Sequence, residues 1–275
     1  AKSNWSRYVA TWGLNATATD ENGRSRQKSA AFELLDAPAT KARLGDDWPG
    51  FFRSGNSRVR EQSRGETPEL AWRVNTGGRC QKAVSPIIYA GRLYVGVDAK
   101  EVGHPGAGVS CYDPADGSLI WHAATDASIC VAPVAADGTI YAVSSLGTCY
   151  ALDAETGDLH WQSQPFGQPE NHRLVQCCPV VAGDELIVVG DSGVCRVLSR
   201  HDGETLRGMD FGGSLIHFSF PSVRAGRVYA GVRKLAVAHA LADGAQLWRT
   251  AISTGKISST PVPHEGRLYV NAAWL

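Results

Sequence analysis

Short apolar runs alternate with polar turn residues along most of the chain, and the pattern repeats. Five copies of one motif begin with a proline, and the prolines stand 40 to 47 residues apart, at Pro86, Pro133, Pro179, Pro221 and Pro261. The eighth residue after each proline is large and apolar or aromatic: Tyr94, Tyr141, Ile187, Tyr229 and Tyr269. Apolar and polar residues that alternate in short runs bounded by turn residues are typical of half-buried β-strands.

A second motif follows in each of the first four copies. It reads "DPADGSLIW", "DAETGDLHW" and "LADGAQLW", with a glycine before the tryptophan, and the third copy, "RHDGETLR", has Arg207 instead. Each unit thus contains four short runs, which predicts four antiparallel strands, and this strand number and period are typical of a β-propeller blade. We predict an all-β propeller with blades at residues 86–132, 133–178, 179–220 and 221–260, and the first two strands of a fifth.

The recurring residue types suit particular strand and turn positions of a propeller blade. The proline opens the strand nearest the central channel, and the turns "AGR", "DGT" and "EGR" supply the glycine of a tight hairpin. The tryptophan falls on the outer strand, where a large indole packs against the neighbouring blade. We therefore favour a structural, inter-blade docking role over a ligand platform for Trp72, Trp121, Trp161 and Trp248. Trp72 lies in "ELAWRVNTG", which we expect to form a lone outer strand.

Three stretches carry a resemblance to a known family. "SPIIYAGRLYVGV", "GTCYALDAETGDLHW" and "DGAQLWRTAISTGKISSTPV" resemble the tryptophan-docking repeats of the PQQ-binding-like β-propeller superfamily, PQQ being pyrroloquinoline quinone. The resemblance covers residues 47–275 and implies about seven or eight blades in a complete propeller. The superfamily includes quinoprotein alcohol dehydrogenases and cofactor-free propellers. Since the chain starts on "AKSNW" and stops within "NAAWL", we expect a fragment of about four and a third blades.

The first part of the chain follows another pattern. "RYVATWGLNATATDENGRSRQKSAAFELLDAP" contains two alternating runs around a "DENG" turn. It loosely resembles the last hairpin of an immunoglobulin-like or fibronectin-like module of the kind that follows calcineurin-like phosphoesterase domains. We expect an Ig-like hairpin at residues 1–38, a linker and propeller lead-in at residues 39–69, and the incomplete propeller at residues 70–275.

The charge balance and the motifs limit the classes of partner and of activity that the sequence favours. Lys plus Arg and Asp plus Glu both number 27, and neither sign forms a block that would favour nucleic acid or an anionic membrane surface. No apolar run is long enough to predict a membrane span. Asp113, Asp153 and Asp243 stand in turns before outer strands, where we expect them to bond their own backbone. We assign no catalytic, cofactor-binding or metal-binding residue.

The cysteines raise one chemical alternative. Seven are scattered among apolar residues, which indicates neither a disulfide framework nor a zinc site. The stretch "RLVQCCPVVAG" sets Cys177 beside Cys178, and quinoprotein dehydrogenases lay a vicinal disulfide against PQQ, near a calcium ion held by Glu, Asn and Asp. Cys178 also occupies the position before the strand proline, so the repeat register favours packing as a small hydrophobe. Packing without a cofactor is our prediction; PQQ with calcium is the alternative.

Two insertions indicate where a partner binds. The first copy carries extra residues at 98–108, between its second and third strands, and the longest connection between blades is 162–176. In a four-stranded blade both kinds of connection emerge on one face, and long loops on a rigid scaffold are usually functional. The predicted binding face consists of Lys100, Glu101, His104, Phe166, Glu170, Asn171, His172 and Arg173.

These observations predict a non-catalytic binding or scaffolding propeller in a larger extracytoplasmic bacterial protein. The expected partner is a protein, peptide or glycan, together with the remaining blades of the full-length chain. The resemblance implies a periplasmic, cell-surface or secreted location. One alternative is part of a PQQ-dependent, quinoprotein alcohol dehydrogenase-like oxidoreductase; another is an accessory propeller of a calcineurin-like phosphoesterase.

Overall fold

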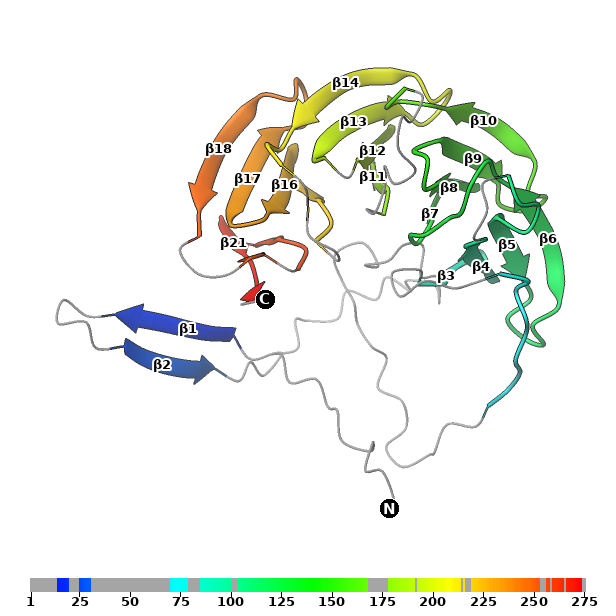
Figure 1. Cartoon of the computed structure of the whole chain (residues 1–275), viewed down its shortest axis with the longest axis horizontal. Coiled ribbons are helices and arrows are strands. Elements are labelled where there is room, and N and C mark those ends of the chain that lie inside the picture. Colours follow the sequence, from blue (N-terminus) through cyan, green and yellow to red (C-terminus); the bar gives the residue numbers. More distant parts are fainter. Residues whose placement is uncertain are drawn as a thin grey trace, which may run out of the picture. The chain divides into compact units, whose positions relative to one another are not determined.

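Figure 1 shows the chain as a computed structural model. It describes residues 14–19, 25–30, 70–78, 85–99, 103–167, 178–190, 192–213, 215, 219–252, 256–257, 259–264 and 266–273. In these ranges every regular element is a β-strand. The chain divides into two units, residues 1–44 and 45–275. In the first unit, β1 (Leu14–Thr19) and β2 (Ser25–Ala30) form an antiparallel hairpin.

Four antiparallel sheets of four strands each follow in the second unit, one for each predicted blade. Blade 1 consists of β3 (Ile87–Tyr89), β4 (Arg92–Val97), β5 (Gly108–Tyr112) and β6 (Leu119–Ala124). Blade 2 consists of β7 (Val134–Ala136), β8 (Thr139–Val143), β9 (Cys149–Asp153) and β10 (Leu159–Ser163). The propeller of four-stranded blades predicted from the repeats is confirmed.

The later blades keep the same order. Blade 3 consists of β11 (Val180–Ala182), β12 (Glu185–Val189), β13 (Val194–Ser199) and β14 (Thr205–Asp210). Blade 4 consists of β15 (Ser222–Arg224), β16 (Arg227–Val232), β17 (Leu235–Ala240) and β18 (Gln246–Ala251). Of blade 5 there are β20 (Val262–His264) and β21 (Arg267–Tyr269), and β19 (Lys256–Ile257) pairs with β22 (Ala272–Ala273).

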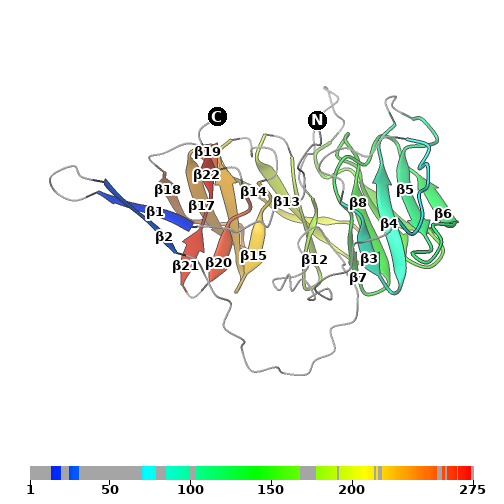
Figure 2. The same ribbon diagram turned by 90° about the horizontal axis from the view of Figure 1, so that it is seen from below.

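The blades follow one another around an arc, with their first strands inside and their fourth strands outside (Figure 1). Each first strand contacts the next, in the order β3, β7, β11, β15 and β20. Figure 2 shows these sheets from below, with the strands of successive blades side by side. The stretch "ELAWRVNTG", expected as an outer strand, is described from residue 70 on and contains no strand there, although Trp72 docks on blade 1 as described below.

The tight turns between first and second strands explain why these runs form hairpins. Ala90 and Gly91 both have positive φ, 48° and 72°, and so do Asp137 and Gly138, at 48° and 78°. Two consecutive residues with positive φ define the two-residue turn whose twist matches paired strands. The turns before the outer strands work differently: Asp153 Oδ1 accepts the backbone N–H of Glu155 at 2.8 Å. The same Asx contact occurs at Asp113 and Asp243.

The apolar cores lie between blades. Second and third strands are mostly buried, whereas the outer strand of each blade is largely exposed. One buried cluster joins Tyr94 and Val109 of blade 1 to Ile140 and Leu152 of blade 2. Close approach requires glycine at Gly96, where a Cβ would lie 2.6 Å from the Ile129 side chain. Consecutive blades therefore share their buried faces.

Candidate functional site

Each blade has two ends that differ in their connections. We call the end with the second-to-third-strand loops and the blade-to-blade connections the loop face, and the end with the tight turns the hairpin face. On the loop face, the backbone N–H of Gly103 donates to Asp126 O at 2.8 Å, and that of Thr125 donates to Ala107 O at 3.0 Å. These bonds fasten the inserted loop of blade 1 to the connection that leads into blade 2.

His104 is an exposed residue of this loop. Its Nδ1 accepts the backbone N–H of Gly106 at 3.0 Å. A second histidine, His122 on β6, connects the loop to strand β5. Its Nε2 lies 3.0 Å from Pro105 O in the loop, and its Nδ1 lies 2.9 Å from Ser110 Oγ on β5. The loop is thus held at several points while the His104 ring faces solvent. Sequence reasoning did not single out His122.

Phe166 is half-buried, whereas His104 is exposed. It packs against a core cluster that includes Val143, Cys149 and Trp161. Its ring therefore anchors the start of the connection after β10 to the blade. The other six members of the predicted face lie outside the described residues: Lys100, Glu101, Glu170, Asn171, His172 and Arg173.

Asp126 adds a polar centre to the loop face. Its Oδ2 accepts the Thr148 hydroxyl at 2.5 Å, and its backbone N–H donates to the Tyr150 hydroxyl at 3.0 Å. Its Oδ1 is inaccessible to solvent and has no hydrogen-bond partner in the described part of the chain. Burial raises the pKa of Tyr150 to about 12, so the phenol keeps its proton. The sequence held no signal for Asp126, since "TDAS" reads as an ordinary turn.

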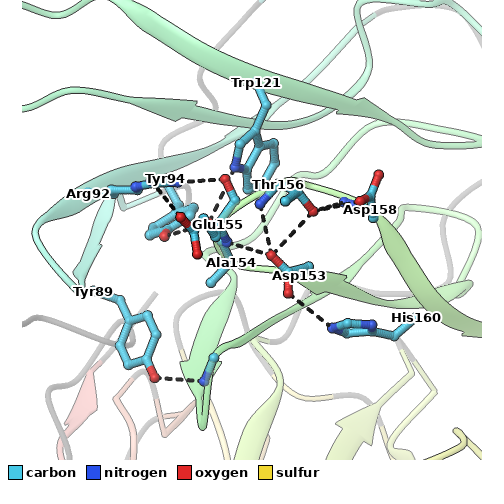
Figure 3. A network of polar contacts seen from close by, with 11 residues as sticks. Tyr89, Arg92, Tyr94, Trp121, Asp153, Ala154, Glu155, Thr156, Asp158 and His160 are labelled. Carbon is cyan, nitrogen blue, oxygen red and sulfur yellow. Dashed lines mark hydrogen bonds and ion pairs between the residues drawn. The ribbon is translucent and has the colours of Figure 1, made fainter.

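The hairpin face carries the seams between blades. Figure 3 shows the seam between blades 1 and 2, where Ala154 O accepts both the Tyr94 hydroxyl, at 2.9 Å, and the Trp121 indole N–H, at 3.3 Å. Arg92 Nη1 donates to Glu155 O at 2.5 Å. The Tyr94 and Trp121 rings lie 5.8 Å apart. The seam thus combines aromatic packing with hydrogen bonds to one exposed turn.

The other tryptophans dock in a comparable way. The indole N–H of Trp72 donates to Pro114 O, and that of Trp161 to Arg200 O, both at 2.8 Å. The rings of Trp72, Trp121 and Trp161 each cover a glycine of positive φ in the turn of the next blade, where a Cβ would lie 2.5 to 2.7 Å from the indole. These glycines are, in the same order, Gly117, Gly157 and Gly203. In the described residues Trp248 has no partner for its indole N–H, but its ring lies 6.2 Å from that of Tyr229.

The cysteine environments bear on the quinone alternative. Cys178 is buried in an apolar cluster with Phe220 and Val197, and burial raises its thiol pKa to about 12. Cys177 lies outside the described residues. Within the described ranges, no three His, Cys, Asp or Glu side chains are grouped so that they could hold a metal ion. The Cys178 thiol thus lies in an apolar packing environment. No helix in the described part of the chain is long and apolar enough to cross a bilayer.

Comparisons with known proteins agree with this architecture. The family described as "Outer membrane protein assembly factor BamB" matches residues 55–208 and 191–273. No curated protein matches the chain. The structure of BamB from Moraxella catarrhalis is similar with a TM-score of 0.50 and 14% identity, over 72% of this chain and 57% of that one.

Two quinoprotein structures are similar to a comparable degree. Quinohemoprotein alcohol dehydrogenase ADHIIG from Pseudomonas putida HK5 has a TM-score of 0.52 and 13% identity, over 74% of this chain and 40% of that one. A europium-containing methanol dehydrogenase has a TM-score of 0.52 and 12% identity, over 72% of this chain and 50% of that one. The chain thus spans only about half the length of the structures it matches, and identities this low show the fold alone.

The class defined by these observations is a PQQ-type β-propeller built of four-stranded, tryptophan-docked blades. Since the matched residues make up most of the chain, the protein belongs to the PQQ_2 family, described as outer membrane protein assembly factor BamB.

Proposed function

We propose that this chain is a non-catalytic binding or scaffolding module of a larger extracytoplasmic bacterial protein, and that its loop face binds a protein, peptide or glycan. One observation carries the proposal: the inserted loop at 98–108 is bonded to the blade 1 connection through Gly103 and Thr125 while it exposes His104. A long loop on a rigid scaffold is a usual place for recognition. The family description, which names an assembly factor, supports a protein partner.

The proposed face extends from His104 to the connection that follows β10. Phe166 fixes the start of that connection to the core. The same two segments of the sequence also contain charged and amide side chains, those of Lys100, Glu101, Glu170, Asn171, His172 and Arg173. Such a mixture suits a polar, partly charged partner surface around a smaller apolar contact.

Site-specific photocrosslinking tests this proposal. A photoreactive phenylalanine analogue is placed at His104 in the full-length protein in its native host, and a matched one at Asp137 on the hairpin face. We expect a defined crosslinked species from position 104 and none of the same mass from position 137. Mass spectrometry then identifies the partner. Identical crosslinks from both positions, or none from position 104, would contradict a binding role for the loop face.

The dehydrogenase alternative has its own assay. The full-length protein is mixed with PQQ and calcium, and quinone absorbance and dye-linked alcohol oxidation are measured. The binding proposal expects neither signal above that of a heat-denatured control. Stoichiometric quinone binding with alcohol-dependent dye reduction would instead establish an oxidoreductase.

A further inference from the structure

A pocket of about 270 Å³ opens on the hairpin face at the seam of blades 2 and 3. Blade 2 contributes the β7–β8 turn, β8 and β10 to its lining, and blade 3 contributes the β11–β12 turn and the β13–β14 turn. Each of these segments lies entirely within the described ranges. The two blades that form the pocket are also complete, with four strands each.

The pocket exists because blade 2 carries a short side chain where its neighbours carry long ones. The first residue of the second strand is Arg92 in blade 1 and Glu185 in blade 3, but Thr139 in blade 2. Arg92 Nη1 donates across the seam of blades 1 and 2 to Glu155 O, and Glu185 pairs with Arg207 at the seam of blades 3 and 4. A threonine is too short for such a contact, so the seam of blades 2 and 3 stays hollow.

The cation inside this pocket is held by groups of the protein itself. The Arg200 side chain is only 9% exposed, and its Nη2 pairs with Asp137 Oδ2 at 2.6 Å. Its Nη1 donates to Gly183 O at 2.6 Å, and its Nε donates to the Tyr141 hydroxyl at 3.2 Å. Because the guanidinium is already paired with a carboxylate and a carbonyl, it offers little to an anionic ligand.

The carboxylates of the pocket, in contrast, have free oxygens. In the described part of the chain, the exposed Asp184 carboxylate makes neither a hydrogen bond nor an ion pair. Asp137 binds Arg200 through Oδ2, which leaves Oδ1 without a partner in the same ranges. The three turns around the pocket also contain Asp202 and Glu204, and Arg200 is their only Lys or Arg. With histidine counted as neutral, the mouth of the pocket therefore carries a net negative charge.

We propose that this pocket binds the side chain of a lysine from a basic segment of a partner protein. An ammonium group donates up to three hydrogen bonds, which suits the free oxygens of Asp137 and Asp184, and such charge-assisted bonds are stronger than neutral ones. Tyr141 and Trp161, whose rings lie 6.0 Å apart, form an aromatic wall. Aromatic rings attract a neighbouring cation and pack against the methylene groups of a lysine. The unpaired carboxylates select against acidic segments.

The size of the pocket favours one side chain over a cofactor. About 270 Å³ is below the range of roughly 300 to 1,000 Å³ typical of sites for drug-sized ligands. The pocket lies on the hairpin face, whereas His104 lies on the loop face. The inference thus stands apart from the loop-face proposal, and either can fail without the other.

Fluorescence anisotropy with the full-length protein tests the inference. The probe is a fluorescein-labelled peptide, Ser-Gly-Lys-Tyr-Lys-Gly-Ser with blocked ends, and the neutral control peptide has Gln in place of Lys. One test variant, Asp184→Asn, removes the free carboxylate. The other, Thr139→Arg, places the residue type of blade 1 in blade 2 and should fill the pocket. The matched control is Glu204→Gln, which removes the same charge from an exposed residue outside the lining. Circular dichroism melts verify that the variants fold.

We expect the basic peptide to bind the wild-type protein and Glu204→Gln within about twofold of each other, and Asp184→Asn about tenfold more weakly. Thr139→Arg should abolish binding. Binding should also weaken between about 50 and 300 mM salt, as charge pairing requires. Equal losses in Asp184→Asn and Glu204→Gln would overturn the inference in favour of unspecific attraction to an acidic surface. Undiminished binding to Thr139→Arg, or equal binding of the neutral peptide, would also overturn it.

Discussion

Arg207 shows how one residue can replace a tryptophan in the seam. Its Nε donates to Leu241 O, which stands at the same place in the turn as Ala154 in the seam of blades 1 and 2. Its Nη2 pairs with Glu185 at 2.6 Å, and both side chains are about four-fifths buried. The partner position on the second strand has also changed, to Ile187. The guanidinium therefore reproduces the indole hydrogen bond without its apolar area.

The first prediction compares these two kinds of seam. Trp161→Ala removes a buried indole and should lower the free energy of unfolding by about 3 to 5 kcal/mol. Arg207→Ala removes a charge-assisted bond and leaves Glu185 unpaired, which should cost less, about 1.5 to 3 kcal/mol. Urea unfolding measures both. A control, Leu247→Ala at a largely exposed position, should change the value by less than about 0.5 kcal/mol.

The second prediction separates backbone strain from steric overlap. Gly91 and Gly157 have similar φ values, 72° and 79°, but a Cβ at Gly91 meets nothing within 4 Å, whereas one at Gly157 lies 2.7 Å from the Trp121 ring. Gly91→Ala should cost about 1 to 2 kcal/mol from the left-handed backbone alone. Gly157→Ala should cost clearly more because the indole must also move. Equal losses in urea unfolding would show that the ring does not rest on the turn.

At the scale of the element, the third strands gain stability by being buried on both faces. Cys149 on β9 and Cys195 on β13 occupy the same position of two blades, and both are fully buried. Burial raises the thiol pKa of Cys195 to about 12 and holds that of Cys149 even higher, because a thiolate is poorly solvated there. These thiols behave as small apolar side chains.

The third prediction follows from these pKa values. A thiol whose pKa is raised on folding contributes stability that is complete below the unfolded value, about 8.5, and is lost as the pH rises toward the folded value. The free energy of unfolding should therefore fall steadily from about pH 8 to pH 10.5. Cys195→Ala with Cys149→Ala should flatten this slope. In the native protein at about pH 8.5, iodoacetamide should leave Cys195 unmodified, as mass spectrometry can show; rapid labelling would contradict its burial.

At the scale of the whole second unit, the buried clusters join consecutive blades. The cluster around Tyr94 joins blades 1 and 2. A separate cluster around Phe211 and Val237 joins blades 3 and 4, and it includes Val131 and Ala132 from the connection into blade 2. In such an array, stability is close to a sum of nearest-neighbour terms. A substitution that weakens one seam should therefore destabilise mainly the two blades that share it.

The fourth prediction tests this locality by hydrogen exchange. Trp161→Ala should speed amide exchange in β9, β10 and β13, which flank the altered seam, and leave β16 and β17 of blade 4 close to their wild-type rates. Mass spectrometry of peptic peptides resolves these strands. A uniform increase across all blades would show that the unit opens as one cooperative body.

The repeat pattern was sufficient to predict the blades, because the period of two and the turn residues are local properties of the chain. Pro86 and its counterparts, the Gly91 turn and the docking position of Trp121 all follow from spacing and residue type. The site was harder to predict. The loop at 98–108 could be found from its length, and His104 from its type, but nothing local distinguished Phe166, which packs inward, from its neighbours in the sequence.

The sequence by itself determined the fold class, the blade boundaries and the residues that recur at each seam, since each depends on spacing along one strand or turn. Only the tertiary structure decided which groups are paired across blades. Arg200 meets Asp137, 63 residues away, and is neutralised, and Arg207 pairs with Glu185 while it also reaches the Leu241 carbonyl of the next blade. These outcomes depend on contacts between residues far apart in the chain, and local pattern carries no information about the charge that a neighbouring blade supplies.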